Sequence, residues 1–319
     1  ETATMFTIQT AVTIVTAGIA STLFRIQLSF EVWALIILSF CFLLLSIGKY
    51  NLLDKMMKVI IIMLSISTIL AVGIAFKNSS GEIPWTQVFP KSNVEVIFLI
   101  AFMGWMPAPL DVSIWHSLWA VEKQKTTDVF NKKTALLDFN IGYFSTIILG
   151  LCFLFLGGLV MHGSGKSFSD NGGEFSLQLI DMYTKNLGDW SFMIIGVAAF
   201  TTMFSTTLTT LDASPRAMNK TMELILEKKL KNGYNAWLIL LIMGTVIIFF
   251  FFLSDMGSLI KIATILSFLT APFYALMNYL LLCSKHTPKV WQPSKKMHIL
   301  SIFGILFLVG FNIWYLTIL

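Results

Sequence analysis

The chain has 319 residues, of which 56% are hydrophobic and only 12% are charged, and its mean hydropathy is +0.79. This composition excludes a water-soluble globular domain and predicts a polytopic membrane protein in contact with the lipid bilayer. The net charge of +5 does not require a nucleic-acid partner, because the basic residues collect in particular loops. We therefore expect no nucleic-acid binding.

Apolar runs long enough to cross a bilayer, about 20 residues each, occur nine times along the chain. They predict one all-α transmembrane domain over 1–319 with helices at about 5–24, 31–48, 56–76, 95–121, 135–161, 189–211, 236–254, 258–283 and 297–318. The chain begins at Glu1 without an initiator methionine or a signal peptide. We expect its N-terminus to be truncated.

Lysine and arginine are unevenly distributed between the predicted loops. Sixteen of the 22 basic residues lie in or beside the even-numbered loops, at 49–56, 122–134, 212–236 and 284–297. Basic loops stay on the cytoplasmic side of a membrane. The pattern predicts that these loops are cytoplasmic and that the protein lies in the plasma membrane, as a bacterial inner-membrane protein would.

The fourth apolar run, 95–121, contains Pro107 and Pro109, with Gly104 before them and Asp111 after them. Each proline removes a backbone donor and clashes with the preceding turn, so the run predicts a helix broken at 107–109. Lipid cannot satisfy the backbone groups that a break releases. Discontinuous helices mark substrate sites in secondary transporters, although a proline kink in an ordinary packing helix is the alternative.

Three ionisable residues in predicted spans are candidates for a coupling-ion or proton path. Asp111 follows the break, where it can cap the second half-helix or bind a cation. His116 can titrate near neutral pH, or it can be structural. Asp138 begins the next helix, which fits an N-terminal cap as well as a proton path.

Hydroxyl residues gather in the inner half of the predicted helix 189–211. Such side chains often bond the preceding turn or a neighbouring helix. Ser205, Thr206 and Thr209 fall on adjoining positions and offer the hard oxygen ligands that sodium prefers. In the predicted helix 258–283, Thr264 and Ser267 precede Pro272, whose freed carbonyl nearby hydroxyls can satisfy. We expect this region to form a cavity wall.

The order of these features resembles the Nramp (natural resistance-associated macrophage protein) family of divalent-metal transporters, which share the LeuT inverted-repeat fold. Gly104-Trp105-Met106-Pro107 resembles the broken sixth helix of that family, whose motif is Met-Pro-His-Asn. The resemblance implies that the nine runs are helices three to eleven and that the first two helices are absent from this chain. Ala108 and Pro109 replace the His-Asn pair of the motif.

The resemblance also implies a binding site. Met106 matches the metal-binding thioether of the family, the carbonyl of Met103 matches a backbone ligand, and Pro107 completes the motif. Thr264 falls where many members carry a coordinating glutamine. A soft thioether favours manganese or iron over magnesium and calcium. The implied activity is proton-coupled symport of a divalent metal by alternating access, with no resident cofactor.

Other functions remain open at this point. One is a sodium-coupled carrier of another small solute that uses Ser205, Thr206 and Thr209. Another is a non-transporting membrane receptor with the same fold. The sequence contains no nucleophile elbow, zinc-protease helix, phosphate loop or dinucleotide fingerprint, so we do not expect an enzyme. We expect a monomer or a weak oligomer.

Overall fold

The computed structural model describes residues 2–26, 28–78, 89–90, 92–106, 109–126, 132–161, 169, 172–252 and 256–317, and within these ranges it contains helices and no strand. Eight described helical segments are long and apolar enough to cross a membrane. The expectation of an all-α polytopic membrane protein is therefore confirmed. The chain divides into two compact units, which we describe separately: Glu1–Thr86 with Ile114–Ile260, and Gln87–Ser113 with Lys261–Leu319.

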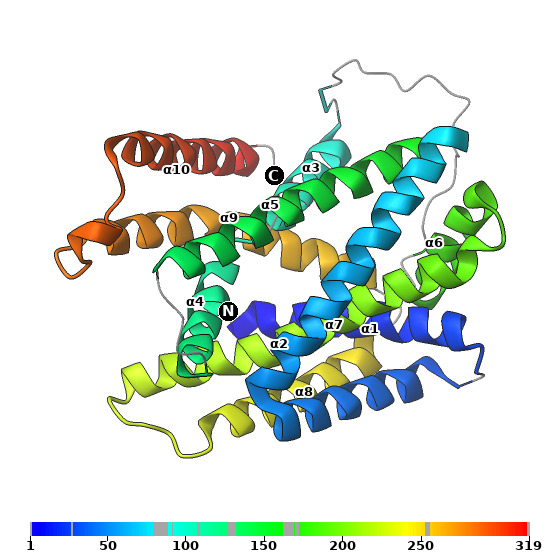
Figure 1. The fold of residues 1–319 in the computed structure, drawn as a ribbon, viewed down its shortest axis with the longest axis horizontal. Helices are drawn as coiled ribbons and strands as arrows, with labels where there is room; N and C mark the ends of the chain where they lie inside the picture. The colour runs from blue at the N-terminus through cyan, green and yellow to red at the C-terminus, as the bar shows by residue number, and fades with distance from the viewer. Residues whose placement is uncertain are drawn as a thin grey trace. The chain divides into compact units, whose positions relative to one another are not determined.

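The first unit is built around α1 (Thr2–Phe24), which packs against four other helices (Figure 1). These are α2 (Phe30–Asn78), α6 (Gly172–Leu187), α7 (Ser191–Ile225) and α8 (Gly233–Phe252). In the apolar 18-residue stretch of α1, 72% is buried inside the protein. The corresponding share is 22% in α7 and in α8. A helix that is apolar or small on all sides belongs at the centre of a bundle, which is where α1 lies.

The interface between α1 and α7 contains a row of buried polar side chains. Thr210 Oγ1 donates to Gln9 Oε1 at 2.6 Å, and Gln9 Nε2 donates to the Thr207 carbonyl at 3.3 Å. The hydroxyls of Thr16 and Thr207 lie 2.9 Å apart. Threonine and glutamine at a helix interface allow close approach and add interhelical hydrogen bonds.

The predicted helices 31–48 and 56–76 are continuous in the structure, because the predicted loop at 49–56 is helical and α2 spans Phe30–Asn78. The segment contains no proline, so no residue in it forces the helix to end. Figure 1 shows that α2 changes direction between its two halves. Each half is a separate candidate span, Phe30–Ile47 and Lys55–Lys77.

The run 95–121, which was predicted to break at 107–109, forms two helices, α3 (Asn93–Trp105) and α4 (Val112–Thr126). The run 189–211 continues to Ile225 in α7, even though Pro215 lies inside it. The remaining helices are α5 (Lys132–Leu156), the π-helical turn η1 (Gly157–Met161), α9 (Met256–Cys283), the 3₁₀ turn η3 (Lys289–Trp291) and α10 (Lys295–Leu316).

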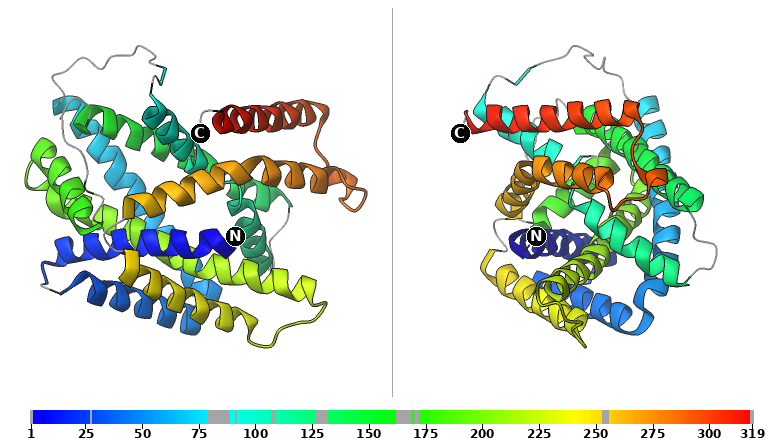
Figure 2. Two further views of the ribbon diagram at one scale, coloured as in Figure 1. Left: turned by 180° about the vertical axis from the view of Figure 1, so that it is seen from behind. Right: turned by 90° about the vertical axis from the view of Figure 1, so that its left-hand side faces the viewer.

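The second unit joins α3, most of α9 and α10. Its apolar core consists of Val96, Ile100, Phe268 and Tyr315. Both views of Figure 2 show α10, in red, returning alongside α9, in orange. Asn312 Nδ2 donates to the Phe268 carbonyl at 3.4 Å. Pro272 lacks the N–H that would otherwise bond this carbonyl, so Asn312, rather than the predicted hydroxyls, supplies the missing donor.

Candidate functional site

The predicted break is present between α3 and α4. The first half-helix ends at Trp105, and Met106 leaves it in an extended conformation with φ −110° and ψ 128°. The second half-helix begins at Val112, whose amide donates to the Pro109 carbonyl at 3.1 Å. Proline has no N–H, so the carbonyls of Met103 and Trp105 have no helical donor four residues later. Pro107 lies outside the described residues.

Within the second unit, α9 forms a wall of this break. Gly104 approaches the carbonyl oxygen of Thr264 so closely that a Cβ atom at position 104 would overlap it. Trp105 Nε1 donates to Ser267 Oγ at 3.3 Å, which fixes the last turn of α3 against the same stretch of α9. The hydroxyl of Thr264 donates to the Lys261 carbonyl at 3.0 Å. The structure thus brings the predicted site residue Thr264 beside the end of α3.

Asp111 is buried at the start of α4, with 7% of its surface exposed. Its Oδ1 atom has no hydrogen-bond partner among the residues that the structure describes. A buried carboxylate oxygen without a partner is costly unless a proton or a cation binds there. Asp111 is therefore the side chain near the break that is best prepared to receive a positive charge.

The two methionines at the break differ in their surroundings. The Met106 side chain is 37% exposed, whereas the Met103 side chain packs against the apolar core of the second unit. No group of three or more His, Cys, Asp and Glu side chains that can hold a metal occurs in the described part of the chain. The donors that the described residues offer at the break are a thioether, backbone carbonyls and one carboxylate.

His116 and Asp138 belong to the first unit. The His116 ring contacts the Phe139 ring edge-on, with the centroids 5.2 Å apart. Asp138 Oδ2 lies 3.0 Å from Lys123 Nζ, and the Asp138 side chain is 56% exposed. Both predicted residues thus lie where α4 meets α5, and Asp138 has a cationic partner. A role of either residue in a proton path stays a prediction.

The hydroxyls predicted to bind sodium donate to carbonyls of their own helix. Ser205 and Thr206 both donate to the Thr202 carbonyl, at 2.8 and 3.0 Å, and Thr209 donates to the Ser205 carbonyl at 2.8 Å. This is the common arrangement of hydroxyls in membrane helices. The oxygens keep lone pairs, so a role in cation binding stays a prediction.

Asp212 begins a predicted loop, 212–236, whereas in the structure it is completely buried on α7. Its carboxylate accepts hydrogen bonds from Trp119 Nε1 at 2.8 Å, Arg216 Nε at 2.7 Å and the Tyr234 hydroxyl at 2.7 Å. The spacing of Asp212 and Arg216, four residues apart, is a recognisable helical ion pair. The amphipathic pattern of 217–230 also predicts a helix directly after this pair.

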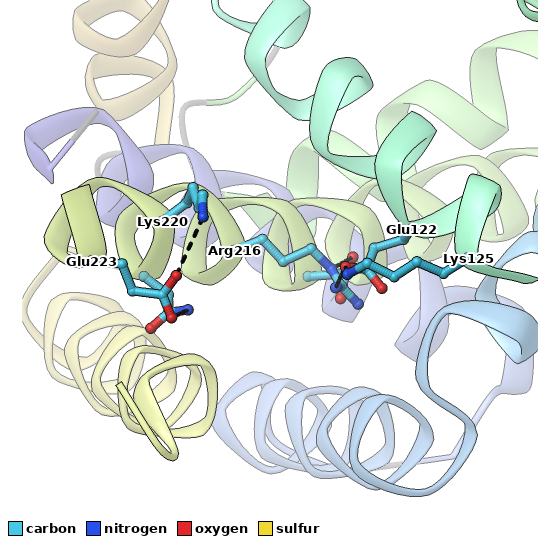
Figure 3. A network of polar contacts seen from close by, with 7 residues as sticks. Glu122, Lys125, Arg216, Lys220 and Glu223 are labelled. Carbon is cyan, nitrogen blue, oxygen red and sulfur yellow. Dashed lines mark hydrogen bonds and ion pairs between the residues drawn. The ribbon is translucent and has the colours of Figure 1, made fainter. Parts of the chain in front are cut away.

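Charged residues from α4 lie near Arg216, the partner of this aspartate. Glu122 Oε1 lies 4.0 Å from Arg216 Nη1 and 2.7 Å from Lys125 Nζ. Figure 3 shows Glu122 and Lys125 beside Arg216, with Lys220 and Glu223 further along α7. We call Trp119, Glu122, Asp212, Arg216 and Tyr234 the Asp212 cluster.

Comparison with known proteins gives two findings. The family model described as natural resistance-associated macrophage protein-like (Nramp) matches residues 1–317. The chain is also 34% identical over 314 residues to a protein of Pasteurella multocida (strain Pm70) called Uncharacterized protein PM0681. That match covers 96% of this chain and 71% of the relative.

Proposed function

Because the chain belongs to the natural resistance-associated macrophage protein-like (Nramp) family, we propose that it carries manganese or iron through the membrane and binds the ion at the α3–α4 break. Membership implies a divalent metal ion transporter, in a family of transporters rather than enzymes. The eight apolar helical segments agree with an integral membrane protein that contacts lipid and moves a small ion. The choice of metal and the site are the proposal.

The observation that carries the site is the buried Oδ1 atom of Asp111, which has no partner in the described ranges and follows a helix break. The thioether of Met106 and the carbonyl of Met103 lie on the other side of that break in the sequence, and Thr264 adjoins Gly104. A soft sulfur ligand together with oxygen ligands suits manganese or iron better than magnesium.

The same carboxylate supports proton coupling. A buried carboxylate binds either a proton or a metal cation, so occupancy by one displaces the other. Coupling through Asp111 would therefore link metal movement to proton movement by competition at one atom. Alternating access would follow from rocking of the broken-helix segment against the remaining helices, with the basic loops on the cytoplasmic side of the plasma membrane.

Isothermal titration of the purified protein with Mn²⁺, Mg²⁺ and Na⁺ tests the site. For the wild-type protein we expect saturable binding of Mn²⁺ and weak or absent binding of Mg²⁺. In Met106→Leu the affinity for Mn²⁺ should fall about tenfold, which corresponds to the loss of one strong ligand contact. Met277→Leu is the matched control, because Met277 is an exposed methionine of α9. Equal binding by both variants would refute the site, and heat from Na⁺ alone would favour the sodium-coupled carrier.

A further inference from the structure

The Asp212 cluster joins three helices of the first unit at one carboxylate. Each hydrogen-bond donor comes from a different helix: Trp119 from α4, Arg216 from α7 and Tyr234 from α8. Asp212 itself is 0% exposed. A single buried side chain therefore holds the second half of the broken helix against two helices that follow it in the chain.

The charge of Asp212 is compensated without any contribution from α4. Arg216 donates to Oδ2 and lies over the Tyr234 ring, with Cζ 5.0 Å from the ring centroid. Tyr234 donates to the other oxygen, Oδ1. If Trp119 leaves, the carboxylate keeps one charged donor and one neutral donor, so no bare charge is left in the apolar interior. The bond from α4 is the one that can open at low cost.

The indole of Trp119 is suited to such a reversible contact. It has one donor and no acceptor, so it can donate to the carboxylate and carries no charge when it is released. Its ring also packs edge-on against Trp115 within α4, with the centroids 6.4 Å apart, and keeps this apolar partner when α4 moves. Glu122 adds a longer contact to Arg216 from the same helix.

We infer that Asp212 is a positioning residue for transport: it holds α4 against α7 and α8, and its hydrogen bond to Trp119 opens when α4 moves. The inference rests on the proposed function, because α4 begins directly after the proposed metal site. Trp119 lies on this helix, seven residues after its first residue, Val112. Movement of α4 would therefore change the position of the Trp119 indole relative to Asp212.

Two variants separate this role from a merely structural one. Trp119→Phe removes the hydrogen bond from α4 and keeps an aromatic ring. Tyr234→Phe removes the hydrogen bond from α8 to the same carboxylate and keeps the one from α4. The reporter is a cysteine introduced by Leu118→Cys, at a half-buried position of α4, after replacement of Cys41, Cys152 and Cys283 by alanine. Its rate of alkylation by a maleimide is measured in purified protein without metal.

We expect Trp119→Phe to increase the alkylation rate about fivefold or more, the effect of one lost hydrogen bond to a charged group, and Tyr234→Phe to change it less than about twofold. Both variants should lower the melting temperature to a similar extent. Equal rates in the two variants, or no change in Trp119→Phe, would overturn the inference.

A second measurement on the wild-type protein covers the case in which Trp119→Phe does not fold. Mn²⁺ should change amide hydrogen exchange in 114–126 of α4 and leave 235–252 of α8 unchanged. Unchanged α4 exchange in protein that binds Mn²⁺ by titration would overturn the positioning role. Absence of Mn²⁺ binding would instead overturn the proposed function, and the metal-free alkylation comparison would still decide the role of Asp212.

Discussion

Two buried aspartates of this protein differ in how completely they are hydrogen-bonded. Asp212, in the first unit, accepts from three donors and pairs with Arg216. Asp111, in the second unit, is almost as buried, at 7% exposed, but its Oδ1 atom has no described partner. A fully satisfied carboxylate stabilises the packing around it, whereas an incompletely satisfied one can bind a cation or a proton. The comparison separates the residue that we infer to position helices from the one that we propose as a ligand of the transported ion.

The largest expected effect comes from breaking the satisfied site. Asp212→Ala leaves the half-buried Arg216 with only the more distant Glu122 carboxylate, at 4.0 Å, as a counter-charge. The substitution should lower the free energy of unfolding by about 3–5 kcal/mol. Unfolding in mixed detergent micelles, followed by tryptophan fluorescence, measures it. Arg216→Leu combined with Asp212→Leu, which removes both charges, should restore part of the loss. A destabilisation below about 1 kcal/mol in Asp212→Ala would contradict the stabilising role of this carboxylate and its hydrogen bonds.

The next effect concerns the contact between α3 and α9. Gly104→Ala places a methyl group against the Thr264 carbonyl, which should destabilise the protein by about 1–3 kcal/mol, as overpacking does. The same unfolding assay applies. Gly304→Ala is the matched control, because a Cβ atom there meets nothing within 4 Å. It should stabilise α10 by up to about 1 kcal/mol, so equal effects of the two substitutions would contradict the close approach.

Asp111→Asn tests the unsatisfied site directly. Loss of the carboxylate should weaken Mn²⁺ binding at least about tenfold, or 1.4 kcal/mol, and should abolish proton-coupled uptake into proteoliposomes. Its free energy of unfolding should stay the same or rise slightly, because the substitution removes a charge without a described counter-charge. Asp189→Asn, at an exposed aspartate, is the control. A stability loss as large as that of Asp212→Ala would show that Asp111 is structural.

The smallest effect is expected at Asp138, an exposed aspartate outside that pair. Its pairing with Lys123 is largely exposed, and exposed ion pairs contribute about 0.2–1 kcal/mol. A double-mutant cycle with Asp138→Asn and Lys123→Gln should give a coupling energy in this range, and Mn²⁺ uptake should be unchanged. Strong loss of uptake in Asp138→Asn alone would move the proton path from Asp111 to the α4–α5 contact.

The sequence predicted the features that depend on local chemistry. Hydropathy located the apolar spans, and Pro107 with Pro109 located the break, because the consequences of a missing N–H are independent of the rest of the fold. The resemblance to the Nramp family indicated Thr264, which the structure places beside Gly104. Whether these residues bind a metal remains a prediction.

The features that the sequence did not predict depend on contacts between residues far apart in the chain. Asp212 follows an apolar run and precedes several basic residues, so it was assigned to a loop; only the folded structure brings Trp119 and Tyr234 to it. The donor to the Phe268 carbonyl is Asn312, 44 residues away. Local patterns do not contain such pairings.

The polar row between α1 and α7 has a consequence for biogenesis. The hydroxyls of Thr16, Thr207 and Thr210 each also lie within hydrogen-bond distance of a carbonyl of their own helix. Each helix can therefore enter the bilayer alone with those groups satisfied. Gln9 is different, because its carboxamide oxygen accepts from Thr210 of the other helix. The Gln9–Thr210 hydrogen bond, in contrast, forms only when α1 and α7 meet in this register.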